Sequence, residues 1–283
     1  MPDHDKSLED DGLVTPEIGG WGKQKYQLVK SYAEIFSSSM KGKWDCRVYV
    51  DLFAGAGRSR LRETGQVVHT SPMLALSVPD QFDRYVFCEK NSKKLEALRT
   101  RVSKEHPDRN VTFLNLDSNI SVSKIISEVP RGSHTFKVLS FCFADPYRLK
   151  NLHFATIESL ARLYIDFLIL IPTGMDASRN VEAYYLPEGN STIDDFLGHP
   201  DWRENWGKER GKKSFDVFLT DLYGLKMKEL KYHYPGASDT QLIRSLEKNL
   251  ALYRLAFFSR NKLGSKFWSE VKKYSDPQMK FFE

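Results

Sequence analysis

Chemistry is most strongly indicated by Asp145-Pro146-Tyr147, which follows an apolar run at 136–144. An amine attached to an aromatic ring is a poor nucleophile because its lone pair is delocalised into the ring. A carboxylate and a carbonyl that accept its N–H bonds localise that lone pair, and a stacked aromatic side chain aims the nitrogen. We therefore predict Asp145, Pro146 and Tyr147 as catalytic residues. A plain turn with proline is the alternative, because the usual form of this motif has two prolines and this chain has one.

A second candidate is the glycine loop 51–57, Asp-Leu-Phe-Ala-Gly-Ala-Gly, which closes another apolar run. Gly55 and Gly57 permit a sharp turn and let a ligand approach the backbone. A dinucleotide loop would add a third glycine and an immediate helix, but Arg60 takes that place and the next helix is expected near Ser71. We therefore predict an S-adenosylmethionine site, with a ligand-free tight turn as the alternative. The predicted contacts in this loop are Asp51, Phe53, Ala54, Gly55 and Gly57.

Carboxylates follow the next two expected strands. Glu89 ends the run 85–88 and can accept both ribose hydroxyls of the cofactor, and Asp117 follows the run 111–116 and can meet its adenine amino group. Hydrogen bonds to charged groups contribute roughly 1.5–3 kcal/mol each. Ser118 and Asn119 compete with Asp117 for this contact. Single acidic residues at strand ends are usually solvated, but two in succession after a glycine loop favour a binding site.

The elements that must position these residues alternate regularly. Strands are expected at 46–53, 85–88, 111–116, 136–144 and 165–171, and helices at 21–40, 92–104, 120–129 and 152–162. Alternation of this kind predicts right-handed βαβ units and a parallel sheet, whose carboxyl ends form a ligand crevice. We predict an α/β, Rossmann-like class I S-adenosylmethionine-dependent methyltransferase fold with a helical insertion after the fifth strand.

Changes in sequence character suggest four segments. Residues 1–20 are polar and acidic and are expected to form a flexible lead-in, and residues 21–172 form the cofactor-binding core. Residues 173–232 contain two tryptophans and an amphipathic helix, and we interpret them as a helical insertion or cap. Residues 233–283 complete the core with a hairpin at the sheet edge and a closing helix.

Composition excludes several classes of protein. The 283 residues are 41% hydrophobic and 28% charged, which is typical of a globular chain and too apolar for disorder. No apolar run is long enough to span a membrane, and no signal peptide is recognisable, so we expect a cytoplasmic protein. The three cysteines lack metal-site spacing and are expected to be buried free thiols, and we predict no metal.

A net charge of +5 permits a nucleic-acid partner without requiring one. The stretch after the glycine loop carries Arg58, Arg60 and Arg62, and we predict that these side chains contact phosphate at the mouth of the site, together with Arg179. A solvated hairpin is the alternative for this stretch.

The chain also resembles the three-Cys-motif partner proteins, a family with a methyltransferase-like fold. The resemblance spans nearly the whole chain, and its order and spacing are more specific than any single motif. Its residues include Trp21 to Lys25, the stretch 49–55, Ser71-Pro72, Glu89-Lys90, Asp117 with Asn119, 144–147, Gly174-Met175, Arg179-Asn180, Trp202, Tyr253 and Phe267-Trp268.

This resemblance implies binding of S-adenosylmethionine and a protein partner with a three-cysteine motif. Lys90 and Ser118 join the predicted cofactor contacts, and Lys25 either faces the cofactor carboxylate or is solvated. We expect a methyltransferase that acts on an exocyclic amine of a nucleic-acid base, in DNA or RNA. The alternatives are a non-catalytic module that works with the partner protein, or a methyltransferase for small molecules or proteins.

Overall fold

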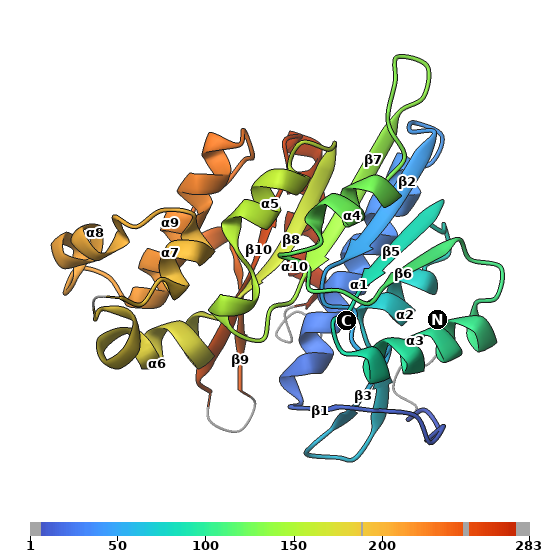
Figure 1. Cartoon of the computed structure of the whole chain (residues 1–283), viewed down its shortest axis with the longest axis horizontal. Coiled ribbons are helices and arrows are strands. Elements are labelled where there is room, and N and C mark those ends of the chain that lie inside the picture. Colours follow the sequence, from blue (N-terminus) through green and yellow to red (C-terminus); the bar gives the residue numbers. More distant parts are fainter. Residues whose placement is uncertain (1–6, 188, 246–248, 276–283) are drawn as a thin grey trace.

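The computed structural model describes residues 7–187, 189–245 and 249–275 (Figure 1). The strands are β1 (Glu17–Ile18), β2 (Cys46–Asp51), β3 (Arg58–Leu61), β4 (Val67–His69), β5 (Arg84–Cys88), β6 (Val111–Leu114), β7 (Val138–Ala144), β8 (Ile165–Ile171), β9 (Gln241–Arg244) and β10 (Ala251–Phe258). The longer helices are α1 (Trp21–Met40), α2 (Ser71–Leu76), α3 (Ser92–Glu105), α4 (Val122–Glu128), α5 (Phe154–Leu160), α7 (Thr192–Leu197), α8 (Trp202–Glu209), α9 (Phe215–Glu229) and α10 (Lys262–Ser275). The short helical turns are η1 (Leu149–Asn151), η2 (Thr173–Ala177), α6 (Ser178–Asn180), η3 (Val181–Tyr185) and η4 (Ala237–Asp239).

A seven-stranded sheet in the order β6-β5-β2-β7-β8-β10-β9 forms the centre of the molecule. The strands from β6 to β8 run parallel, and β10 lies antiparallel between β8 and β9. The chain enters at β2, moves outward through β5 and β6, and returns to β7 at the side of β2. This order, with one antiparallel strand next to the edge, is that of the class I methyltransferase fold, so the predicted fold class is confirmed.

Burial on both faces explains why the central strands are continuous apolar runs. Every residue of β2 and β7 is buried. Helices α1, α2, α3 and α10 contribute to the hydrophobic core on one face of the sheet, and α4 and α5 to the core on the other (Figure 1). Parallel strands need such cover because their crossover helices lie on the sheet faces.

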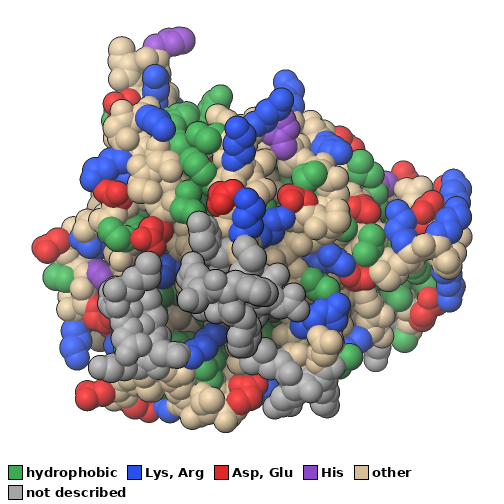
Figure 2. Space-filling model, turned by 180° about the vertical axis from the view of Figure 1, so that it is seen from behind, with side chains coloured by type: hydrophobic (Ala, Val, Ile, Leu, Met, Phe, Trp, Pro, Cys, Tyr) green, Lys and Arg blue, Asp and Glu red, His purple; other side chains and the backbone are tan. Residues whose placement is uncertain are grey.

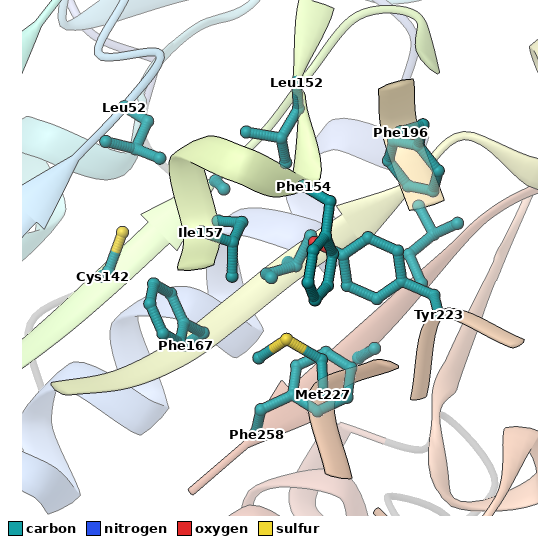
Figure 3. Close-up of a cluster of buried hydrophobic side chains, with 14 of the residues drawn as sticks. Leu52, Cys142, Leu152, Phe154, Ile157, Phe167, Phe196, Tyr223, Met227 and Phe258 are labelled. Atoms are coloured by element: carbon teal, nitrogen blue, oxygen red, sulfur yellow. The ribbon is translucent and has the colours of Figure 1, made fainter. Parts of the chain in front are cut away.

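The helical insertion after β8 shares the core of the sheet. Phe196 and Tyr223 of the insertion pack beside Phe154 of α5, and Met227 lies near Phe258 of β10 (Figure 3). The Tyr223 ring centroid lies 4.8 Å from that of Phe196 and 5.6 Å from that of Phe154. The two tryptophans of the insertion are also buried, so these large rings stabilise the packing of the insertion and do not form an open surface.

The segment 7–20 differs from the flexible lead-in that the sequence predicted. Its strand β1 pairs with β3, and β3 and β4 complete a small three-stranded sheet. The buried guanidinium of Arg101 donates to the carboxylate of Asp11 at 2.7 and 2.8 Å and to the carbonyl of Val14 at 3.0 Å. Acidic residues that look solvated in the sequence find arginine partners in the folded chain.

The cysteines are Cys46, Cys88 and Cys142, and all three are free and buried, as predicted. Within the described ranges, no helix combines the length and the apolar character needed to cross a membrane.

Candidate functional site

The candidate site lies where β2 and β7 end side by side. The glycine loop follows β2 and Asp145 follows β7, and the chain leaves these two strands toward opposite edges of the sheet. The amide of Leu52 donates to the carbonyl of Phe143 at 3.1 Å, so strand pairing continues to within two residues of Asp145. Such a switch point, at the carboxyl ends of parallel strands, is where open α/β sheets bind ligands.

An ion pair joins helix α1 to this site. Lys25 Nζ lies 2.5 Å from Asp145 Oδ2, although 120 residues separate the two in sequence. Lys25 is only 3% exposed, and its ammonium lies 4.5 Å from the ring centroid of Tyr26 and 5.3 Å from that of Trp21. The alternative of a solvated lysine is therefore wrong. Its carboxylate partner in the folded chain is the predicted catalytic residue Asp145.

The electrostatics of the site keep Lys25 charged. Burial favours the neutral amine, but the carboxylate of Asp145 and the hydroxyl of Tyr26 outweigh burial and raise the pKa of Lys25. Burial also raises the pKa of Tyr26 to about 12. A buried ammonium is tolerated only when it is paired. One carboxylate oxygen of Asp145 is engaged in this pair, which leaves the other for a second donor.

The glycine loop has one open side and one packed side. Gly55 has a φ of +65°, and a Cβ added there would meet no atom within 4 Å. Gly57 has a φ of +82°, but a Cβ there would lie 2.8 Å from Leu98 and 3.1 Å from Met73. Gly55 therefore leaves space beside the loop, whereas Gly57 allows the loop to pack on α2 and α3.

The two other predicted contacts of the loop are more enclosed. Ala54 is buried and its amide donates to the carbonyl of Cys88 at 2.9 Å, which ties the loop to the end of β5. Phe53 is half-buried against the core. These residues fix the shape of the loop through backbone and packing contacts.

Glu89 spans the gap between the loop and the end of β5. Its Oε2 accepts the amide of Gly55 at 3.0 Å, and its Oε1 accepts the amide of Asn91 at 2.8 Å. Each carboxylate oxygen can accept a second hydrogen bond. Glu89 is therefore oriented by two backbone donors, with acceptor capacity remaining on both oxygens.

Asp51 is fully buried at the end of β2. Burial raises the pKa of Asp51 to about 7, and the nearby charges of Asp145 and Glu89 act in the same direction. The hydrogen bonds from Ser71 and from the Phe53 amide lower this pKa but do not outweigh burial. A positive charge placed near the buried carboxyl of Asp51 would favour its ionised form.

The end of β6 supplies the next group of predicted contacts. Asp117 is half-buried, and its Oδ2 lies 3.6 Å from Nζ of the exposed Lys90. Ser118 is 3% exposed. The side chain of Asn119 donates to the carbonyl of Asn151 at 2.9 Å and accepts the amide of His153 at the same distance. Asn119 thus anchors the segment that follows β7.

Asp176 is a positioning residue that the sequence did not reveal. Its carboxylate accepts the amide of Leu149 at 2.8 Å and the hydroxyl of Tyr185 at 2.6 Å. These contacts tie the insertion to the chain just after Tyr147, which is 69% exposed, while Pro146 is buried. The only sequence signal was a single acidic residue shortly after the end of a strand.

Arg58 and Arg60 have acidic partners. Arg58 Nη2 lies 2.8 Å from Glu105 Oε1, and Arg60 Nη2 lies 2.5 Å from Asp10 Oδ2. These pairs attach the N-terminal segment and α3 to β3. Both guanidinium groups, which were predicted to contact phosphate, therefore have a structural role as well.

Arg62 and Arg179 are exposed. Burial raises the pKa of Tyr253, and the charges of Asp145 and Tyr147 act in the same direction. The charge of Arg62 acts on the same hydroxyl and lowers its pKa. Arg62 is therefore near the candidate site. On the face seen in Figure 2, basic and acidic side chains are interspersed and form no single basic patch.

Comparisons with known proteins bear on the fold. No protein-family model matches the chain, and no curated protein matches its sequence. A solved structure of protein LPL1258 from Legionella pneumophila is 12% identical, with a TM-score of 0.50 over 91% of this chain and 92% of that chain. At this identity the likeness shows the fold alone.

Two further solved structures are less similar. Trm1 from Pyrococcus horikoshii, in complex with S-adenosyl-L-methionine, is 8% identical, with a TM-score of 0.45 over 92% of this chain and 63% of that chain. Magnesium protoporphyrin IX methyltransferase from Synechocystis, with the same cofactor bound, is 12% identical, with a TM-score of 0.39 over 84% of this chain and 80% of that chain.

Proposed function

We propose that this protein is an S-adenosylmethionine-dependent methyltransferase that acts on an exocyclic amine of a nucleic-acid base. The observation that carries the proposal is the carboxylate of Asp145, held by the buried Lys25 beside the glycine loop at the switch point of the sheet. A methyl donor bound over the loop would lie at the edge of the sheet where the fixed carboxylate of Asp145 is followed two residues later by the exposed aromatic ring of Tyr147.

The groups around the glycine loop suit this cofactor in charge. Space beside Gly55 permits close approach to the backbone, and Glu89 has free acceptor capacity for the two ribose hydroxyls. Asp117 and Ser118 follow β6 at the same edge of the sheet as the glycine loop, which supports their proposed contact with the adenine. Asp51 and the other carboxylates favour a ligand that carries a sulfonium and an ammonium group.

When bound, this cofactor would supply a methyl group made electrophilic by the adjacent sulfonium. The free oxygen of Asp145 would accept an N–H bond of the acceptor amine and localise its lone pair toward the methyl carbon. The methyl group would pass to the nitrogen with the C–S electron pair left on sulfur, and the methylated amine would release its proton to water. Lys25 keeps Asp145 oriented throughout, and Tyr147 holds the flat acceptor ring.

A nucleic-acid base is the acceptor that best matches an exposed tyrosine next to cationic side chains. Base–aromatic stacking contributes about 1–3 kcal/mol per base, and a base taken from a duplex must be flipped at a cost of a few kcal/mol. The guanidinium of Arg148 lies 5.7 Å from the ring centroid of Tyr147, and Arg62 is nearby, so phosphates flanking the base would meet positive charge.

We also propose that the chain belongs with the three-Cys-motif partner proteins. Residues of that resemblance that are distant in sequence lie together here. Lys25 contacts Asp145, and the ring centroids of Trp21 and Tyr253 are 4.9 Å apart. Co-purification of the protein with a three-cysteine-motif protein encoded in the same genome would test the proposed partnership.

Methyl transfer from labelled cofactor to DNA, RNA and protein pools tests the proposed activity. Asp145→Ala is expected to abolish transfer and to leave cofactor affinity largely intact, because Asp145 faces the acceptor. Tyr147→Ala should impair use of the acceptor, whereas Tyr147→Phe should have a mild effect because the ring face matters more than the hydroxyl. Label that appears only in protein, or a Tyr147→Phe variant that is inactive, would refute transfer to a base.

A further inference from the structure

A second cavity lies at the opposite end of the sheet from the glycine loop. Its volume is about 120 Å³, and it is bounded by the amino ends of β7 and β8, the second half of α1 and the start of α10. Its floor includes Leu139, Ile165 and the carboxyl side chain of Asp166. Neither the proposed cofactor crevice nor the acceptor residues contribute to this cavity.

The mouth of this cavity is formed by apolar side chains that reach solvent. Tyr164 is 65% exposed, and its ring centroid lies 5.5 Å from that of Trp44. Leu263 at the start of α10 is also exposed. These two rings and Leu263 offer contact surface for a ligand that carries an aromatic ring.

One acidic group stands among these apolar walls. Gly264 brings α10 close to it, because a Cβ at Gly264 would lie 2.6 Å from Ser259 Oγ and 3.3 Å from Asp166 Oδ2. The other charged group at the cavity, Arg260, donates to the carbonyls of Ala161 at 2.6 Å and of Leu163 and Leu230 at 3.2 Å. Three N–H groups of Arg260 are thus engaged by backbone carbonyls, and Asp166 is the acidic group at the cavity that can accept a hydrogen bond from a cationic ligand.

We propose that this cavity binds a small aromatic amine, with its ring between Trp44, Tyr164 and the apolar walls and its ammonium group paired with Asp166. An apolar cavity of about 150 Å³ can hold benzene, so a single ring matches the volume here. Aromatic rings attract cations, and a carboxylate forms a strong charge-assisted hydrogen bond to an ammonium. The proposal does not depend on methyltransferase activity.

The charge of Asp166 gives this site a pH dependence. Burial raises the pKa of Asp166 to about 7, opposed by hydrogen bonds from Ser259 and Tyr32 and by the charge of Arg260. Tyr232 also faces this carboxyl, and burial keeps both tyrosines neutral by raising their pKa values. An ammonium ligand should therefore bind more tightly as the pH rises from 6 to 8, by up to about tenfold if only the ionised carboxylate binds it.

Titration of the full chain with benzylamine, followed by ligand-observed NMR and by Trp44 fluorescence, is the primary test. We expect a dissociation constant of about 1 mM or lower at pH 8, weaker binding of toluene, and no binding of benzoate. Absence of benzylamine binding at about 10 mM, or equal binding of the three probes, would overturn the proposal.

Variants locate the site. Asp166→Asn should remove the preference for benzylamine over toluene, and Tyr164→Ala should weaken both. Leu225→Ala on α9 is the matched control, because Leu225 is a comparably exposed apolar side chain, at 52%, but does not line this cavity. Equal losses in the Tyr164 and Leu225 variants would place the ligand elsewhere. If Asp166→Asn does not fold, the pH titration of the unmodified protein decides, and affinity that stays flat from pH 6 to 8 would refute pairing with Asp166.

Discussion

At the scale of single residues, the candidate crevice holds more negative than positive charge. The carboxyl groups of Asp51, Glu89 and Asp145 influence one another, and Lys25 is the buried cation that is paired with one of them. A ligand with a sulfonium and an ammonium group would offset this excess. Burial, with the charges of Asp145 and Glu89 acting in the same direction, raises the pKa of Asp51 to about 7.

Asp51→Asn should therefore remove a pH dependence from cofactor binding. In the parent protein, affinity for S-adenosylmethionine should rise from pH 6 to 8 as Asp51 ionises, by about threefold to tenfold. The variant should bind S-adenosylmethionine more weakly, and its affinity should not rise with the ionisation of residue 51. Titration of the ligand itself affects both proteins equally and cancels in the comparison. Titration calorimetry at three pH values measures the difference. If the affinities of the parent protein and the variant change in parallel with pH, the charge of Asp51 does not contribute to cofactor binding.

The same substitution should stabilise the protein without ligand. The folded-state pKa of Asp51 is raised above the ordinary value of 3.8, so the folded state binds the extra proton and stability is lost as pH rises from about 4 to 7. Asp51→Asn avoids this loss, and we expect its advantage in thermal unfolding to be larger at pH 8 than at pH 5. An upper bound is about 4 kcal/mol. An advantage that is larger at pH 5 would contradict the assigned pKa shift.

At the scale of elements, two glycines serve different ends. Gly55 keeps a loop open toward the crevice. Gly174 in η2 allows the insertion to cross β10 closely, since a Cβ there would lie 1.8 Å from the carbonyl oxygen of Ala251. The first glycine is expected to matter for the ligand and the second for the fold.

Alanine at each of these glycines separates the two roles. Gly55→Ala should fold with a loss of about 1–2 kcal/mol from its left-handed backbone, but it should bind S-adenosylhomocysteine at least tenfold more weakly. Gly174→Ala should be destabilised by more, about 3 kcal/mol, because backbone must move. Urea unfolding and calorimetric titration provide both readouts. Normal binding by folded Gly55→Ala would show that the ligand does not approach the loop there.

Local patterns predicted those elements whose packing is regular. Helix α1 follows its three-and-four spacing of apolar residues from Trp21 to Met40, and the buried strands follow their apolar runs. The hairpin of β3 and β4 corresponds to the alternative expected for the stretch after the glycine loop. Its pairing with β1 was not predicted, because β1 has only two residues and lies about forty residues from β3 in sequence. The alternation of strands and helices likewise predicted that the glycine loop and Asp145 lie at the same edge of the sheet.

The individual partners of the site could not be read from the sequence. Glu89 is a predicted residue, but its bond to the Gly55 amide depends on how β2 and β5 align. The pair of Lys25 with Asp145 depends on a helix that crosses the sheet, and the bond from Leu149 to Asp176 depends on the path of the insertion. Sequence predicts which strand end carries a group, whereas long-range packing decides which atom it meets.

At the scale of the whole molecule, we propose that three exposed arginines meet phosphate, and the guanidinium of one of them, Arg148, lies 5.7 Å from the ring centroid of Tyr147. Arg62, Arg148 and Arg179 are exposed, unlike the paired Arg58 and Arg60. On the face seen in Figure 2, the mixed charges would give little steering toward a polyanion. Binding of nucleic acid is therefore expected to depend on this small group of cations.

Replacing Arg62, Arg148 and Arg179 by alanine should weaken RNA or DNA binding and reduce the salt dependence. The slope of log affinity against log salt should fall by about 2–3, since each phosphate contact contributes roughly 0.7–0.9. The matched control replaces Arg131, Lys137 and Arg162, which are exposed at the amino ends of the strands. Fluorescence anisotropy across a salt series measures both. Equal slopes in the two triple variants would exclude this surface as the nucleic-acid site.

The ion pairs around the crevice also have a consequence for the order of folding. Lys25 and Asp145 are 120 residues apart, and Arg101 and Asp11, which brace the outer side of the glycine loop, are 90 apart. Closing loops of that length lowers the entropy of the chain before the contact between the two residues contributes any stabilisation. During synthesis, Lys25 leaves the ribosome long before its partner is made and must remain unburied until β7 exists. We expect the crevice to be among the last parts of the molecule to consolidate, after the sheet that carries it.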